Sequence, residues 1–118
     1  MKKNLTVAAL AVLLSATAGA VETEVTGSAK AGQSKVAMCI GCHGIAEYRT
    51  AFPEVYRVPL LGGQNAKYIQ VALQGYKHGD RKYSTMHALA ASLSEQDMAD
   101  IAEYYAAQKP FSPNNPDK

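Results

Sequence analysis

The 118-residue chain has no tryptophan and only two phenylalanines, while the part after residue 20 carries fourteen alanines. Its helices therefore have little bulk to bury. Apolar burial stabilises a fold by about 25 cal/mol per Å², and each ordered residue costs roughly 1.5 kcal/mol of conformational entropy. So thin a core predicts that a large apolar group fills the interior, although composition alone does not identify that group.

Long hydrophobic runs are also missing. The longest, Leu5–Ala18, has 14 residues, fewer than the roughly 20 needed to span a bilayer. It follows two lysines and precedes Ala18-Gly19-Ala20, which is typical of a signal peptide cleaved after Ala20. We therefore expect residues 1–20 to be removed and the chain to be exported to the periplasm without stable membrane insertion. A retained membrane anchor is the alternative interpretation.

Charge of one sign is not in excess. The chain has 12 Lys and Arg against 10 Asp and Glu, and two of the lysines lie in the expected signal peptide. The exported part is therefore neutral, and it lacks the basic surface of a nucleic-acid-binding protein. We expect it to comprise a lead-in (residues 21–27), one domain (28–110) and a loose polar tail (111–118).

Strand-like alternation of apolar and polar residues is absent, which predicts an all-α fold. We expect helices over residues 29–38 and 65–77, a short helical piece over 86–93, and a last helix that starts after Ser94 and is ended by Pro110. Ser94 and Asp97 have the spacing of a helix-capping pair. Residues 47–63, broken by prolines and glycines, predict an irregular loop that wraps a bound group.

The two cysteines lie in one motif, Cys39-Ile40-Gly41-Cys42-His43. C-x-x-C-H is the attachment signature of c-type haem: two cysteines three apart share one side of a helical turn, and the histidine can reach the iron from the same side. A thioredoxin-type redox pair would need a βαβ pattern, and a zinc site would need a second pair of Cys or His ligands at the right spacing. Neither pattern is present, so we expect one covalently bound haem, held by Cys39 and Cys42, with His43 on the iron.

The opposite side of the iron needs a second ligand or stays open. Met86 is the favoured candidate because it is expected in a flexible loop after Gly79-Asp80-Arg81. Met98 falls on the apolar stripe of the last helix and is interpreted as core, and His78 is expected to face solvent. His87, next to Met86, and an open iron site are the alternatives.

With these motifs in order along residues 28–107, the chain resembles a class I cytochrome c of the small bacterial periplasmic monohaem type. The carriers are C-x-x-C-H, the run Pro59-Leu60-Leu61-Gly62-Gly63-Gln64, then Gly79-Asp80-Arg81 with Met86, and the last helix. The resemblance implies three to four helices wrapped around one haem. It also implies that the first and last helices cross closely, with Gly32 matching the small residue there and Tyr104 or Tyr105 the aromatic one.

The same resemblance implies further site residues. The carbonyl of Pro59 would accept a hydrogen bond from His43, which fixes the ring of an iron ligand, and Arg81 would pair with a haem propionate. Gln64 and Tyr68 are further propionate candidates, whose alternative interpretations are a polar group at a helix start and a core tyrosine.

The function that this implies is a one-electron carrier, not an enzyme, that binds periplasmic or membrane-bound redox proteins transiently and is a monomer. A second hypothesis is a haem subunit of a periplasmic dehydrogenase complex, suggested by the aromatic and basic residues of segment 48–58. A third is an open-site haem peroxidase or gas-binding protein, which requires that Met86 does not bind the iron.

Overall fold

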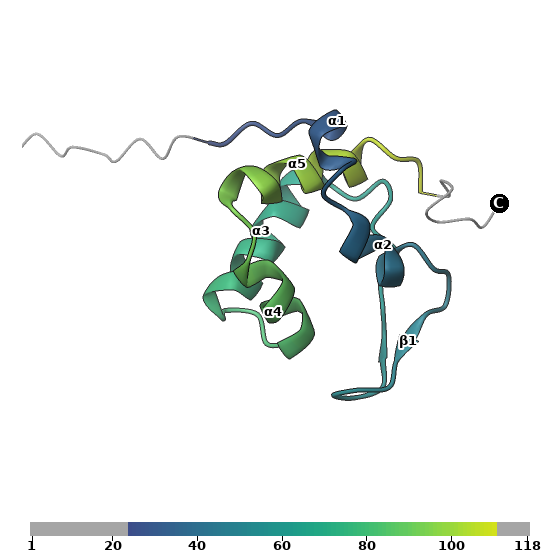
Figure 1. Cartoon of the computed structure of the whole chain (residues 1–118). Coiled ribbons are helices and arrows are strands. Elements are labelled where there is room, and N and C mark those ends of the chain that lie inside the picture. The colour runs from purple at the N-terminus through teal and green to yellow at the C-terminus, as the bar shows by residue number, and fades with distance from the viewer. Residues whose placement is uncertain (1–23, 111–118) are drawn as a thin grey trace, which may run out of the picture.

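A computed structural model describes residues 24–110, so the expected signal peptide (1–20) and the tail (111–118) lie outside the described residues. Figure 1 shows the helices gathered together, with one small hairpin at the lower right edge. The helices are α1 (Ala29–Gly32), α2 (Ala37–His43), α3 (Ala66–His78), α4 (Ser84–Ala91) and α5 (Glu95–Ala106). The hairpin pairs β1 (Arg49–Thr50) with β2 (Tyr56–Arg57) in antiparallel register. Within residues 24–110 the regular secondary structure is thus helical apart from two strands of two residues each.

The predicted helix over residues 29–38 is in fact two helices. α1 is one turn, and after Gly32 the chain bends, with the amide of Lys35 donating to the Gly32 carbonyl at 2.8 Å. The bend has a tertiary cause, because Gly32 lies against α5 while Lys35 reaches two carboxylates of α5, Asp97 and Asp100. Counting both pieces, the described chain has five helices where three to four were expected.

The α1–α5 crossing is as close as the glycine predicts. A Cβ atom on Gly32 would lie 2.1 Å from the Asp100 carbonyl oxygen and 2.7 Å from the Tyr104 Cβ. A Cβ on Gly27, in the lead-in, would lie 2.1 Å from the carbonyl oxygen of Ala99. The aromatic residue opposite Gly32 is therefore Tyr104. Tyr105 points elsewhere, into the core.

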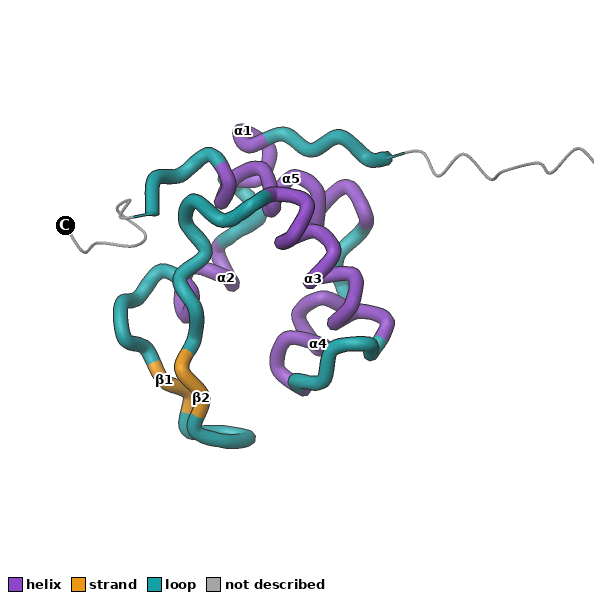
Figure 2. Tube along the Cα trace, turned by 180° about the vertical axis from the view of Figure 1, so that it is seen from behind, coloured by secondary structure: helices purple, strands orange, loops and turns teal. Residues whose placement is uncertain are grey.

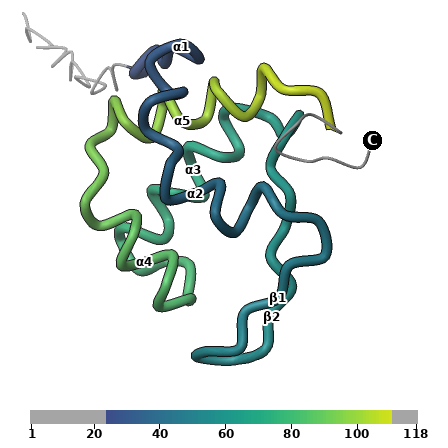
Figure 3. Tube along the Cα trace, turned by 45° about the vertical axis from the view of Figure 1, so that its right-hand side comes forward, coloured from purple at the N-terminus to yellow at the C-terminus, as the bar shows by residue number. Residues whose placement is uncertain are grey.

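The core lies where α2, α3 and α5 meet. In Figure 3 the trace of α2 passes in front of α3 and below α5. Its members are Val36, Ile69, Leu73, Met98, Ile101, Ala102 and Tyr105. Met98 is fully buried there, as its place on the apolar stripe predicted. Local capping fixes the helix ends: Asn65 caps α3, Gly79 ends it in the left-handed conformation, and Ser94 caps α5 in a capping box.

Two expectations about helix ends need correction. The helical piece expected over residues 86–93 is α4, which begins two residues earlier, so Met86 lies not in a loop but in its first turn, where the alanine-rich sequence up to Ala91 favours helix. The last helix stops at Ala106, before Pro110, and the carbonyl of Tyr105 accepts hydrogen bonds from the amides of Gly63 at 2.9 Å and Gln108 at 3.2 Å. Over residues 24–110 none of the helices has the length and apolar character that a membrane span requires.

The segment predicted as an irregular loop contains the hairpin. In Figure 2, α2 and the hairpin stand on one side and α3 with α4 on the other. Tyr48 closes the hairpin base through its carbonyl, which accepts from the amide of Val58 at 2.9 Å. The tip carries exposed apolar side chains, Phe52 at 85% and Val55 at 71%.

Candidate functional site

One mainly apolar cavity opens between the α2–hairpin side and the α3–α4 side. Most of the site residues expected from the sequence line it, namely Cys42, His43, Pro59, Gln64, Tyr68, Arg81 and Met86. Its walls add aliphatic side chains, namely Val58, Leu60, Leu61, Ile69, Leu73 and Leu89. Residues from four separate segments of the chain therefore converge on one space.

Helix α2 presents the two cysteines. Cys39 and Cys42 carry free thiols and stand three residues apart, which places them on one side of the helix. Cys42 lines the cavity, whereas Cys39 is half-buried and packs against the core. Burial raises the pKa of the Cys39 thiol above its ordinary value. The motif is thus held with Cys42 facing the cavity and Cys39 packed against the core.

His43 is the last residue of α2, and its ring is oriented by the following segment. Its Nδ1 lies 2.6 Å from the carbonyl oxygen of Pro59, the contact that the resemblance implied. Because a carbonyl only accepts, Nδ1 carries the hydrogen and donates it. Burial lowers the pKa of His43, and the Pro59 hydrogen bond acts in the opposite direction. The neutral ring then keeps a lone pair on Nε2, the atom that a metal can bind.

Met86 is the candidate for the second iron ligand that lines the cavity. Its side chain is partly buried against the core, from the first turn of α4. The rivals lie elsewhere. Met98 is sealed in the core, His78 is exposed at the end of α3, and the Nδ1 of the exposed His87 lies 2.7 Å from the Tyr76 carbonyl oxygen.

Arg81 stands at the rim of the cavity, fixed by α3. Its amide donates to the carbonyl of Gly75 at 3.0 Å, and its guanidinium carbon lies 4.9 Å from the ring centre of Tyr76 and 6.0 Å from that of Tyr68. Tyr68 is 52% exposed and therefore not a core tyrosine. Gln64 accepts from the amide of Asn65 at 2.8 Å, the contact of a polar group at a helix start.

The cavity wall also has polar residues that were not singled out as site residues from the sequence, among them Thr50, Tyr56 and Tyr83. Thr50 and Tyr83 are 33 positions apart, yet their hydroxyl oxygens lie 2.9 Å from each other. The rings of Tyr56 and Tyr83 are 5.2 Å apart. The aromatic residues of segment 48–58 were the signal that could have pointed to Tyr56. No comparable sequence signal pointed to Tyr83, which lies just before the helix of Met86.

The residues present fit a covalently bound haem. Two thiols and an imidazole come from one helix, a thioether comes from another, the walls are aliphatic and an arginine stands at the rim. A directly bound ion fits less well, because no group of three or more His, Cys, Asp or Glu side chains suited to a metal occurs within residues 24–110. The donor set therefore matches a porphyrin with iron.

Comparisons with known proteins agree with this geometry. The cytochrome c family model matches residues 29–108. The chain is 42% identical over 83 residues to cytochrome c4 of Pseudomonas aeruginosa, covering 70% of this chain and 39% of that protein. It is 38% identical over 86 residues to cytochrome c-554(548) of Halomonas halodenitrificans, covering 70% of this chain and 99% of that protein.

A solved structure is also similar: the crystal structure of reduced recombinant cytochrome c4 from Pseudomonas stutzeri. The TM-score is 0.58 at 38% identity, covering 71% of this chain and 47% of that one. The chain thus spans less than half the length of the cytochrome c4 proteins it matches here. On the family match and the near-complete coverage of cytochrome c-554(548), the chain belongs to the cytochrome c family, whose cofactor is a covalently attached haem c.

Proposed function

We propose that this chain is a periplasmic one-electron carrier with a single haem. Cys39 and Cys42 would attach the haem, and His43 and Met86 would supply the two protein ligands of its iron. Haem iron supplies a reversible one-electron change, and a His/Met ligand pair shifts its potential upward. The proposal also includes removal of residues 1–20 as a signal peptide.

The observation that carries the proposal is that one cavity receives both the imidazole of His43 and the thioether of Met86. With both positions on the iron filled, a small substrate would have no place to bind, which favours a carrier over an enzyme. The chain's own residues then hold the ligands still. Pro59 fixes the His43 ring, and α4 presents the thioether from a helix rather than from a loose segment.

Redox partners of such a site form weak complexes with small interfaces near the haem edge. The neutral formal charge of residues 21–118 gives little long-range steering. Electron-transfer rates with a periplasmic or membrane-bound partner should therefore change little with added salt. A steep fall would show that a charged patch governs docking.

The test of the proposal is the weak far-red absorption band that an iron–thioether bond gives to an oxidised cytochrome c. We expect this band in the wild-type holoprotein and its loss in Met86→Ala. Met98→Leu is the matched control, because it replaces a sealed core methionine with a residue of similar size and should keep the band. A wild-type protein without the band would favour the open-site peroxidase or gas-binding hypothesis.

A mass measurement of the same material tests attachment. The periplasmic protein should weigh the chain without residues 1–20 plus one haem, and Cys39→Ala with Cys42→Ala should abolish covalent haem. Colourless wild-type protein with reactive thiols would contradict the proposed attachment of haem to Cys39 and Cys42, on which the rest of the proposal depends.

The second candidate, a haem subunit of a periplasmic dehydrogenase complex, is favoured by the hairpin tip, where Phe52 and Val55 expose apolar surface. Scattered exposed apolar residues are ordinary, so this is a weaker argument than the shared cavity. Sizing of the native periplasmic fraction separates the two: a haem peak at the monomer mass supports the free carrier, and copurification with a larger redox chain supports the subunit.

A further inference from the structure

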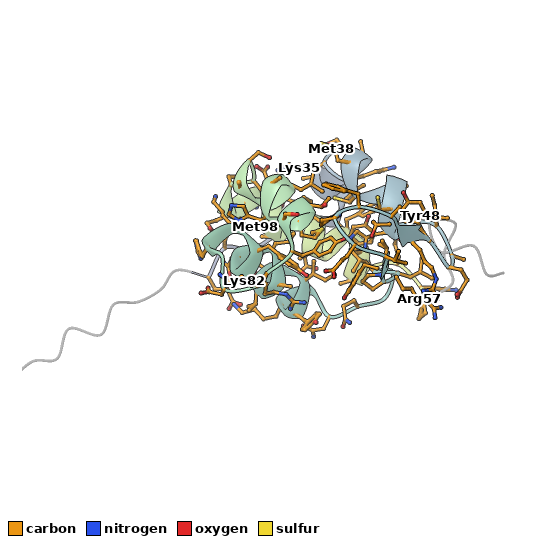
Figure 4. All side chains as sticks on the ribbon, turned by 90° about the horizontal axis from the view of Figure 1, so that it is seen from below. Lys35, Met38, Tyr48, Arg57, Lys82 and Met98 are labelled. Atoms are coloured by element: carbon orange, nitrogen blue, oxygen red, sulfur yellow. The ribbon has the colours of Figure 1, made fainter. Side chains whose placement is uncertain are left out.

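Helix α4, which carries Met86, has few neighbours. Among the helices and strands of residues 24–110 it packs against α3 alone. Its N-cap residue, Tyr83, makes no side-chain hydrogen bond to its own helix. The Tyr83 side chain lines the cavity and instead contacts the hairpin. Seen from below, Arg57 of the hairpin and Lys82 of the α3–α4 loop lie well apart, with side chains filling the space between (Figure 4).

Two contacts join Tyr83 to the hairpin. Its hydroxyl oxygen lies 2.9 Å from Oγ1 of Thr50, and its ring stacks at 5.2 Å and 40° on the ring of Tyr56. The one hydrogen of the Thr50 hydroxyl also has two carbonyl oxygens within reach, that of Glu54 at 3.1 Å and that of Tyr56 at 3.4 Å. Either hydroxyl could donate in the Thr50–Tyr83 contact. Because carbonyls only accept, the arrangement that satisfies a carbonyl as well has Thr50 accepting and the phenol of Tyr83 donating.

Tyr83 is also joined directly to the turn that holds Met86. Its carbonyl accepts the first hydrogen bond of α4, from the amide of His87 at 2.9 Å. On the other side, the Nδ1 of His87 lies 2.7 Å from the carbonyl oxygen of Tyr76 in α3. The first turn of α4 is thus held at Tyr83 and at His87, with Met86 between them. Of these two residues, Tyr83 is the one that contacts the hairpin across the cavity.

We propose that the Tyr83–Thr50 hydroxyl pair is a latch that positions Met86. By tying the first turn of α4 to the hairpin, it keeps the thioether directed into the cavity and opposes its replacement on the iron. The proposal rests on Met86 being the second iron ligand. Tyr83 and Thr50 are positioning residues, since both act on the thioether through the backbone of α4.

The experiment measures how easily imidazole displaces the thioether in the oxidised holoprotein, followed by loss of the far-red band. Tyr83→Phe keeps the ring and its stacking on Tyr56 but removes the donor, and Thr50→Val removes the acceptor. Each variant should bind imidazole about five- to tenfold more tightly, the size expected for one hydrogen bond between neutral groups. The double variant should bind no more tightly than either single one, because both remove the same interaction.

Two controls separate positioning from general destabilisation. Ser84→Ala removes an exposed hydroxyl from the same turn and should leave the imidazole affinity unchanged. Asp100→Asn loosens the far α1–α5 contact and should lower the melting temperature without changing that affinity. Hydrogen exchange at the α4 amides should accelerate in the two latch variants and not in the controls.

Wild-type protein with the band but unchanged imidazole affinity in Tyr83→Phe would overturn the latch while leaving the ligand assignment intact. Additive effects of the two single variants would also overturn it, because the hydroxyls would then act separately. Wild-type protein without the band would overturn the ligand assignment itself, and the positioning role with it.

Discussion

The two sides of this molecule are built differently. At the α1–α5 crossing, Gly32 leaves no space for a methyl group and a buried carboxylate, Asp100, holds three separate groups. On the side of the hairpin and α4, the strands are two residues long, and Tyr83 joins the start of α4 to the hairpin through one hydroxyl contact and one ring contact. Close packing on one side thus contrasts with a few specific hydrogen bonds on the other.

The difference suggests that the two sides have separate roles. The crossing and the core near Met98 should set the stability of the fold, whereas the α4 side should set the behaviour of the iron ligand. His43 lies between these two sides of the molecule. Its helix, α2, packs against the core, and its Nδ1 donates to the carbonyl of Pro59 in the following loop. Variants on the two sides should therefore move different observables, and five predictions test this.

The largest effect is expected at the crossing. In Gly32→Ala the added methyl would overlap the backbone oxygen of Asp100, so α1 and α5 must separate, at a cost of about 3 kcal/mol in the free energy of unfolding. Denaturant melts of the holoprotein measure this cost. The far-red band at low temperature should be unchanged.

Gly41→Ala is the matched control for that variant, because a Cβ at Gly41 would meet no atom within 4 Å. In a helix, alanine is preferred to glycine by about 1 kcal/mol, so this variant should be as stable as the wild type or slightly more so. Equal destabilisation by both glycine variants would show that helix content, not the crossing, dominates.

The next effect is expected from the carboxylate of Asp100. It accepts from the amide of Ser28 at 2.7 Å, the ammonium of Lys35 at 2.7 Å and the side-chain amide of Gln96 at 2.9 Å. Asp100→Asn keeps the shape but removes the charge, and should cost about 2 kcal/mol, because hydrogen bonds to charged groups are the stronger ones. Its thermal melt should drop while imidazole binding stays unchanged.

The same cluster predicts a dependence on pH. The ammonium of Lys35 holds the pKa of Asp100 and of Asp97 below the ordinary range. A carboxyl with a lowered pKa in the folded state stabilises the fold above its unfolded pKa of about 3.9, and this stabilisation is lost as the pH falls through the folded value. Wild-type stability should fall below about pH 4, and Asp100→Asn should show a shallower fall over the same range.

Much of the fold followed from local sequence. The capping pair of Ser94 and Asp97, the end of α3 at Gly79 and the burial of Met98 depend on residues within one or two turns. These features are local, so the sequence carries their signal directly. The close contact of Gly32 with the last helix was implied by the family resemblance.

Long-range contacts could not be predicted in the same way. The bend after Gly32 comes from contacts with α5, about 65 residues away, where Lys35 meets Asp100. The hairpin depends on pairing two-residue strands that are too short to show alternation. The Thr50–Tyr83 contact joins two segments with no shared pattern, and it therefore appears only in three dimensions.

A smaller effect, of opposite sign, is expected inside the core. The Tyr105 hydroxyl is buried and has no hydrogen-bond partner among the described residues, and burial raises its pKa, so it stays neutral. Tyr105→Phe removes this unpaired group and should stabilise the fold by about 1 kcal/mol. A lower melting temperature would show that the hydroxyl has a partner in the holoprotein, and that the core side also depends on specific hydrogen bonds.

The smallest effect is expected at the hairpin tip. Val55 is 71% exposed, so Val55→Ser removes little buried surface and should change the free energy of unfolding by less than about 0.5 kcal/mol. Imidazole affinity should also stay at the wild-type value, because the latch holds the strands through Thr50 and Tyr56, not through the tip. If Val55→Ser did bind imidazole more tightly, the tip would have to transmit strain through β1 to Tyr83, and the hairpin would act on Met86 as one rigid body rather than through a single hydroxyl pair.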